Sequence, residues 1–349
     1  MKNLLLPALL IVIPGGAALA TEYKTERALR VEIETELKLE TTTMEIERDG
    51  EKQESPGGSS SHSRRKEVHV DKVVEVKDGQ PTKVRRTFES VGGKTERTFG
   101  ENSNETDLES PLEGVTLEIV RGEDKVESTA VEGGSPDGKA LEGHRTELFL
   151  DALLPASDVK ADDTWELDSE TVRRALRLDV SGALFAPPAR PEGGGEGGGD
   201  GGGRRRGGRG MGGADSGLLS RAEWTGKAKL VSFDHDVDGT ACAEIEIQLE
   251  ASGDMPEPER GGGRGERSYS PEVIVLPAAS NTYQISLEGK FYFAVKERRP
   301  VLLDLEGTAK VERENEMTRG ETTMRIHVVQ EGSVLVQVKV SEQAADKEK

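Results

Sequence analysis

The sequence predicts a mainly β (α+β) fold, in which a curved antiparallel sheet of long strands carries one or two short central helices and Gly/Arg-rich inserts. Apolar and polar residues alternate over long stretches, which is the period of a half-buried strand. Turn residues such as Asp78-Gly79 separate these stretches, as they do in hairpins. Helical patterns occur only in the middle of the chain, which is typical of an α+β fold.

The N-terminus resembles a cleavable secretory signal peptide. Lys2 precedes an apolar run at 4–13, and the small residues Ala18 and Ala20 precede a predicted cut that leaves Thr21 as the new N-terminus. The apolar run is too short to span a bilayer, and no later run is longer. We therefore expect an exported protein, periplasmic or extracellular, without a membrane span.

Composition limits the classes of partner. The formal net charge is −19, and this acidity repels nucleic-acid backbones, so no nucleic-acid partner is expected. Cys242 is the single cysteine, which excludes an internal disulfide framework. Hydrophobic residues make up 33% and aromatic residues 4% of the chain, which favours a sheet buried on one face over a large globular core.

The first strand pattern changes phase along its length. Apolar residues occupy odd positions from Leu29 to Leu39 and even positions at Met44 and Ile46. Because strand side chains alternate between faces, this change would turn the apolar set over unless a bulge intervenes, so we expect one near Thr42.

Two hairpins are expected next. Valines at 68–76 lead through Asp78-Gly79 to a return strand at 84–88, and a second pair runs from Val115 to Val126. Two short helices follow. The first covers 148–154 and ends at Pro155, and the second begins at a cap on Asp168 or Ser169. The second helix would place three residues on one face, namely Val172, Ala175 and Leu176.

The Gly/Arg-rich stretch at 191–217 cannot bury enough apolar surface to fold and is expected to be disordered. Trypsin should therefore cut first between Arg204 and Arg209. Strand patterns resume after this stretch. The expected organisation is a signal peptide at 1–20, strands and helices at 21–190, the insert at 191–217, and strands at 218–349 that belong to the same fold as 21–190.

A metal site is considered at Asp234, Asp236 and Asp238, which with Gly239 match the start of a calcium loop. The match ends at Ile245, where an EF-hand has a bidentate glutamate. Aspartate and glycine are also favoured in a plain hairpin turn, and that interpretation is preferred. No cofactor is expected apart from a weakly bound calcium ion.

Catalytic motifs are not found. The five histidines show neither H-E-x-x-H nor another metal-ligand spacing, and no G-x-S-x-G elbow occurs. No catalytic or cofactor-binding residue is therefore predicted, and the many charged runs are interpreted as solvated strand faces. A Ser-His-Asp triad remains an open alternative, because its members converge only in space.

Three stretches, 85–90, 110–114 and 153–165, resemble those of uncharacterised exported bacterial proteins. In their order of strands, helices and strands, such proteins resemble the half-barrel folds of periplasmic lipid and lipoprotein carriers. The resemblance implies a fold and no site residues, and the present chain departs from it by its long Gly/Arg inserts.

Three functions are therefore weighed. The favoured one is a non-enzymatic exported protein that binds an apolar ligand, such as a lipid, or another envelope protein. The alternative is a structural or adhesive surface protein with a weak calcium site, and the third is a hydrolase with an unrecognised site. A deep apolar cavity, a flat solid sheet, or a histidine converging with serine or aspartate in a cleft would distinguish them.

Overall fold

The computed structural model describes most of the chain. Most of the predicted signal peptide and the whole 191–217 insert lie outside the described residues. The described ranges are 17–55, 57–185, 218–255, 273–275, 280–319 and 321–343.

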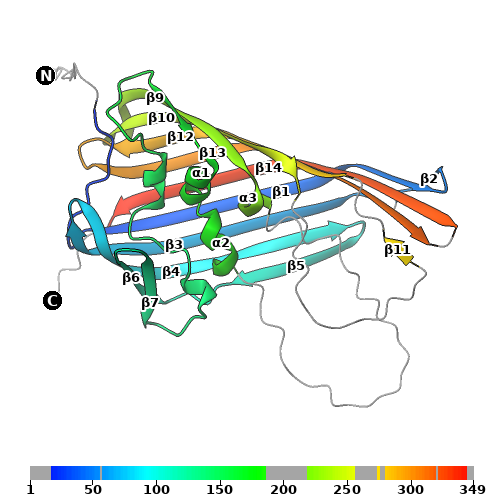
Figure 1. Ribbon diagram of the computed structural model, residues 1–349, viewed down its shortest axis with the longest axis horizontal. Helices are drawn as coiled ribbons and strands as arrows, with labels where there is room; N and C mark the ends of the chain where they lie inside the picture. The colour runs from blue at the N-terminus through cyan, green and yellow to red at the C-terminus, as the bar shows by residue number, and fades with distance from the viewer. Residues whose placement is uncertain are drawn as a thin grey trace, which may run out of the picture.

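The described strands form one antiparallel sheet of 14 strands, which confirms the predicted fold class (Figure 1). The order along the sheet is β7-β6-β4-β3-β1-β14-β13-β12-β10-β9-β8, with β2, β5 and β11 paired to β1, β4 and β13. Because β7 and β8 end this order without pairing to each other, the sheet is open. The strands are β1 Ala28–Arg48, β2 Glu51–Gln53, β3 Ser59–Lys77, β4 Gln80–Phe99, β5 Asn102–Glu109, β6 Thr116–Arg121, β7 Val126–Glu132, β8 Thr164–Leu167, β9 Trp224–Val237, β10 Thr240–Asp254, β11 Val273–Val275, β12 Ser280–Ala294, β13 Arg299–Arg319 and β14 Thr322–Glu342.

Strands from both sides of the 191–217 segment belong to this sheet. The first long strand, β1, pairs along nearly its whole length with the last, β14, from Leu29 opposite Glu342 to Arg48 opposite Met324. At the far edge, β8 pairs with β9. Chain segments before and after the insert are thus joined at two places in one sheet.

The predicted bulge in β1 is confirmed. The register of β1 against β14 shifts between Thr41 and Thr43. Beyond the shift, Met44 pairs with Val328. Val328 has an even number, as Val334 does, so both side chains lie on the same face of β14. The extra residue therefore keeps the apolar set on one face despite its change of phase.

Both predicted hairpins are confirmed. Strands β3 and β4 join through Asp78 and Gly79, whose φ angles of 52° and 77° are those of a type I′ turn. Strands β6 and β7 form the second hairpin, closed by a hydrogen bond from the Gly122 amide to the Lys125 carbonyl at 2.8 Å.

Short helices lie over one face of the sheet (Figure 1). The predicted helix at 148–154 is present as a 3-10 helix, and the second begins at Asp168, whose carboxylate accepts a hydrogen bond from the Thr171 amide at 2.8 Å. Val172 and Ala175 are buried, as predicted. The helices are η1 Lys139–Leu141, η2 Phe149–Leu153, α1 Ser169–Ala175, α2 Leu178–Leu184 and α3 Leu218–Arg221. None of the helices in the described ranges is long and apolar enough to cross a bilayer.

The apolar core between the helices and the sheet has two parts. The larger part joins β1, β9, β10 and strands β12 to β14 to η2 and α1, with Trp224 and Phe291 among its fully buried side chains. The smaller part joins β4 and β6 to η1 and α2, around Phe88, Leu117 and Val180. Strand β3 runs between the two parts.

Little large apolar surface is left open in the described part of the chain. The large hydrophobic side chains that are exposed there are Phe99, Val120 and Val131, at 48%, 38% and 44%. The helices and the sheet itself therefore bury most of the apolar side chains of the described strands.

Candidate functional site

A row of ionisable side chains lies on the covered face of β3. Glu67, His69 and Asp71 alternate along the strand, so their side chains share one face. Each is less than 5% exposed. Their partners across the ladder are apolar residues of β1, with Glu67 opposite Ile33, His69 opposite Val31 and Asp71 opposite Leu29. This row separates the two apolar clusters.

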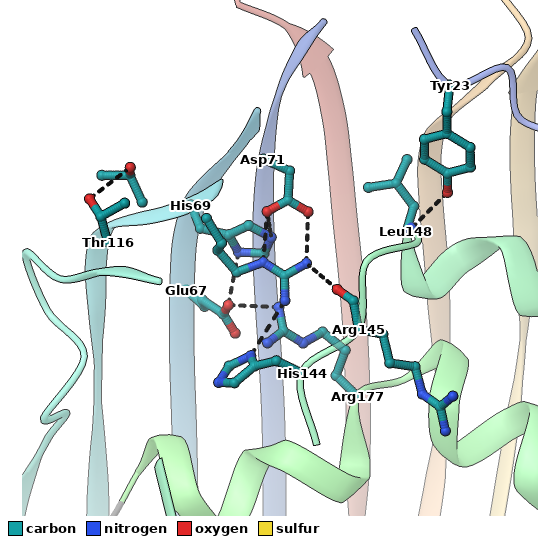
Figure 2. A network of polar contacts seen from close by, with 11 residues as sticks. Tyr23, Glu67, His69, Asp71, Thr116, His144, Arg145, Leu148 and Arg177 are labelled. Carbon is teal, nitrogen blue, oxygen red and sulfur yellow. Dashed lines mark hydrogen bonds and ion pairs between the residues drawn. The ribbon is translucent and has the colours of Figure 1, made fainter. Parts of the chain in front are cut away.

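Two arginines neutralise the carboxylates of the row (Figure 2). Arg86 of β4 donates two hydrogen bonds to Asp71, at 2.6 and 2.7 Å, in a bidentate pair. Arg177, between α1 and α2, donates from Nη1 to Glu67 at 2.7 Å. Both arginines are buried, so the network holds two cations and two anions between the helices and the sheet.

Arginine proximity sets the charge of the two carboxylates. Burial alone would raise the pKa of Glu67, but Arg177, His69 and Arg86 outweigh burial and lower it to about 2. The pKa of Asp71 is also lowered, because Arg86 and His69 outweigh its burial. Both side chains are therefore ionised at neutral pH.

His69 is fully buried inside this network. Glu67 Oε1 lies 2.8 Å from its Nδ1 and Asp71 Oδ1 lies 3.8 Å from its Nε2, but neither contact has the alignment of a hydrogen bond. Burial lowers the pKa of His69 despite the neighbouring carboxylates. The ring is therefore neutral at physiological pH.

His144 adds a second neutral imidazole, supplied by the loop between η1 and η2. Its Nε2 lies 2.9 Å from the Ala140 carbonyl, to which it must donate, so Nδ1 is left as an acceptor for Arg86 Nη1 at 3.4 Å. Burial and the charges of Arg86 and Arg177 lower its pKa to about 3. The ring of Phe88 lies between the two histidines and contacts both, with centroid distances of 5.7 Å to His69 and 5.8 Å to His144.

A cavity of about 60 Å³ lies beside this network, between β1, β3 and the helices. One wall is apolar, and the other carries Arg65, Glu67 and Arg177. Arg65 lies over the ring of Phe185, 5.2 Å from its centroid. The apolar wall includes Ile33, Leu37, Leu176, Leu178 and Leu184. A site of this kind holds a ligand that is apolar over most of its surface and polar at one end.

The predicted cleavage residues lie on the surface beside buried neighbours. Ala18 and Ala20 are exposed, whereas Leu19 between them is 2% exposed and packs in the core. Ala17 exchanges two backbone hydrogen bonds with Val159, at 2.8 and 3.1 Å. Cleavage after Ala20 would remove Leu19 from the core. The cut itself stays a prediction.

Directly after the predicted cut, two side chains form hydrogen bonds with Asp151 of η2. Thr21 donates to Asp151 Oδ1 at 2.6 Å, and the Tyr23 hydroxyl donates to the other carboxylate oxygen. The same hydroxyl accepts from the Leu148 amide at 2.8 Å. Burial raises the pKa of Asp151 to about 6, and the hydrogen bonds from Thr21 and Tyr23 keep the pKa from rising further.

Of the three aspartates considered for calcium, Asp234 and Asp236 lie at the end of β9 and Asp238 lies in the turn to β10. Asp234, Asp236 and Asp238 are exposed, and Asp236 Oδ1 accepts from the Gly239 amide at 3.0 Å. Asp238 has a φ of 52°, and Gly239 has a φ of 84°. The turn thus gives these residues a backbone role. Within the described ranges no group of three histidine, cysteine or acidic side chains is placed to hold a metal ion, and calcium binding here stays a prediction.

Neither the protein-family models nor the curated protein sequences include a match to this chain. Interpretation of the site therefore depends on its geometry. The buried network was missed because charged runs were interpreted as solvated faces. One signal was available: Glu67, His69 and Asp71 occupy the same phase of β3 as Val73, which is buried in the core.

Proposed function

We propose that this is an exported, non-enzymatic binding protein that holds an apolar or amphiphilic ligand, such as a lipid, between its sheet and its helices. The observation that supports the proposal is the cavity beside Arg177, because it combines an apolar wall with a charged one. The open antiparallel sheet with helices on one face also agrees with the resemblance to periplasmic half-barrel carriers.

The size of the cavity limits the ligand that fits without rearrangement. A volume of about 60 Å³ has room for roughly two water molecules, or for the first carbons of an acyl chain. A longer chain requires α2 to move away from β1 and β3. Medium-chain amphiphiles are therefore the appropriate first probes.

The buried histidines do not favour the hydrolase alternative. His69 and Asp71 converge, but neither lines this cavity or the smaller one described below. His144 has a pKa of about 3 and accepts from Arg86, so it is a poor general base at neutral pH. These features support a binding role and a structural role for the network.

Native mass spectrometry of protein purified from an envelope extract tests the proposal. We expect co-purifying amphiphile on the wild type and none on Leu37→Trp, because the larger ring fills the cavity. Leu335→Trp is the control, since Leu335 follows the buried Val334 on β14 and its side chain points to the opposite face. A ligand-free wild type that also fails to bind added octanol or octanoate would contradict the proposal.

A further inference from the structure

A second cavity, of about 30 Å³, lies between the η1–η2 loop and helices α1 and α2. Arg177 lines both this cavity and the larger one. Four arginines and two carboxylates line the smaller cavity, in a chain whose net charge is −19. These residues are Arg86, Arg145, Arg174, Arg177, Glu147 and Asp179.

The carboxylates at this cavity already have other partners. Glu147 pairs with Arg121, and Asp179 pairs with Arg173 at 3.0 Å. Arg174 Nη2 lies 4.0 Å from Glu147, at the limit of an ion pair. Arg86 and Arg177 pair with Asp71 and Glu67, so the positive charge that has no close carboxylate at this cavity is that of Arg174.

Two of the arginines that line the cavity have a buried donor without a hydrogen-bond partner. Arg177 is 7% exposed, and while its Nη1 bonds to Glu67, its Nη2 is buried with no hydrogen-bond partner. Arg174 Nε is likewise buried without a partner. By contrast, Arg86 is satisfied by Asp71 and by the carbonyl of Arg145, whose side chain points away from the cluster (Figure 2).

An unpaired buried donor on a charged group is costly. Leaving such a donor unsatisfied costs about 1–3 kcal/mol or more, and an oxyanion would offset that cost with charge-assisted hydrogen bonds. His144 does not compete for these donors, because its acceptor nitrogen faces Arg86. The cavity thus has the donors and the charge of a site for a small oxyanion.

We infer that Arg177 Nη2 and Arg174 Nε bind a carboxylate or phosphate group in this cavity. Because Arg177 also lines the apolar cavity, the group is the head of the amphiphile whose chain lies against Ile33 and Leu37. The inference of an anionic head group rests on the proposed function, whereas the oxyanion site stands on its own donors. The ligand is thus an anionic amphiphile.

Three probes separate the two levels of this inference. Octanoate and octanol differ in the head group, and inorganic phosphate supplies an oxyanion without a chain. Calorimetric titration of the exported full-length protein should show octanoate binding about tenfold or more tightly than octanol, which is the size expected for one charge-assisted hydrogen bond. Phosphate should bind weakly and compete with octanoate.

Variants identify the donors. Arg174→Met should abolish the preference for octanoate and leave octanol binding unchanged. A Glu67→Gln/Arg177→Met double variant, which removes both members of the buried pair without leaving a lone buried charge, should also abolish the preference for octanoate. Arg85→Met is the control, because Arg85 lies next to Arg86 on β4, pairs with Glu118 at the surface and does not line the cavity.

Each outcome decides between the two proposals. Equal affinity for octanoate and octanol, with no phosphate binding, would overturn the oxyanion site and keep the apolar ligand. Phosphate binding that is lost in Arg174→Met, without binding of either amphiphile, would keep the oxyanion site and overturn the proposed function. If none of the three probes binds, both are overturned.

Discussion

Glu67 and Arg177 are 110 positions apart in the chain, and their buried side chains meet at 2.7 Å between the sheet and the helices. Glu67 projects from β3, and Arg177 occupies the junction of α1 and α2 with a φ of 54°, in the left-handed region. The pair therefore fixes a junction in the helical cover to one strand. It also forms one wall of the apolar cavity.

Removing one member of this pair should destabilise the fold more than removing both. Arg177→Met leaves Glu67 as a buried, uncompensated charge, and we expect it to lower the free energy of unfolding by about 3–5 kcal/mol. Adding Glu67→Gln should recover part of that loss. Urea unfolding followed by tryptophan fluorescence measures both, with Trp224 in the core as the reporter.

A surface pair supplies the control for this experiment. Arg173 and Asp179 also meet at 3.0 Å, but their side chains are 35% and 44% exposed. Arg173→Met should therefore change the free energy of unfolding by less than about 1 kcal/mol. Equal losses in Arg177→Met and Arg173→Met would show that the buried pair has no special role.

Local sequence signals predicted the sheet well. The phase change between Leu39 and Met44 placed the bulge, because alternation along a strand is a strict geometric period. The Asp168 cap and the Asp78-Gly79 turn followed from backbone chemistry that acts over a few residues. Such features do not depend on which strands become neighbours.

The charged network could not be predicted in the same way. Both faces of β3 at this point are buried, with Val68 at 4% and His69 at 0% exposure, so alternation does not show which face meets the helices. The partners of the network come from β4 and from the loop and helices near 144 and 177. Their convergence depends on the strand order and on where the cover settles.

Stability should depend on pH through Asp151. Its pKa is raised from 3.8 to about 6, so the folded state favours the protonated carboxyl. The stability linked to this group is fully present below about pH 4 and is lost as the pH rises through 6. We expect a contribution on the order of 3 kcal/mol across that window.

Comparison with Asp151→Asn isolates this contribution, because every other titrating group is shared by the two proteins. Unfolding free energies measured between pH 4 and pH 7 should show the wild type losing stability relative to the variant as the pH rises. A constant difference across this range would mean that Asp151 titrates at its ordinary pKa.

The N-terminus of exported protein should be Thr21. Ala18 and Ala20 satisfy the small-residue requirement of a signal peptidase, and both are exposed. Intact mass measurement of secreted protein tests the cut, and Ala20→Leu, which places a large residue at the cut, should retain the precursor. Folded exported protein that still carries Met1 would contradict the predicted localisation.

The candidate calcium site lies at the turn between β9 and β10. Millimolar calcium should raise the melting temperature of the wild type if it binds there. Asp236→Asn should remove the increase and still let a side-chain oxygen accept from the Gly239 amide, so it separates charge from turn geometry. Asp254→Asn, at the other end of β10, is a control for general charge effects. If calcium leaves the melting temperature of the wild type unchanged, the role of Asp236 is confined to the turn.

Cleavage within the Gly/Arg-rich stretch should leave a two-fragment protein that stays assembled. The sequence predicts that trypsin cuts first between Arg204 and Arg209. The resulting fragments would share the long β1–β14 seam, where Val31 faces Val340 and Ile33 faces Val338, and the shorter β8–β9 seam. Val338 is 1% exposed, so separating the fragments would expose core residues along a whole strand.

Nicked protein should therefore elute from a sizing column as the intact protein does, and it should separate only in denaturant. Val338→Asp should weaken this association, whereas Lys339→Asp, the next residue and on the exposed side of β14, should not. Separate elution of the fragments under native conditions would replace the single fold with two independent domains.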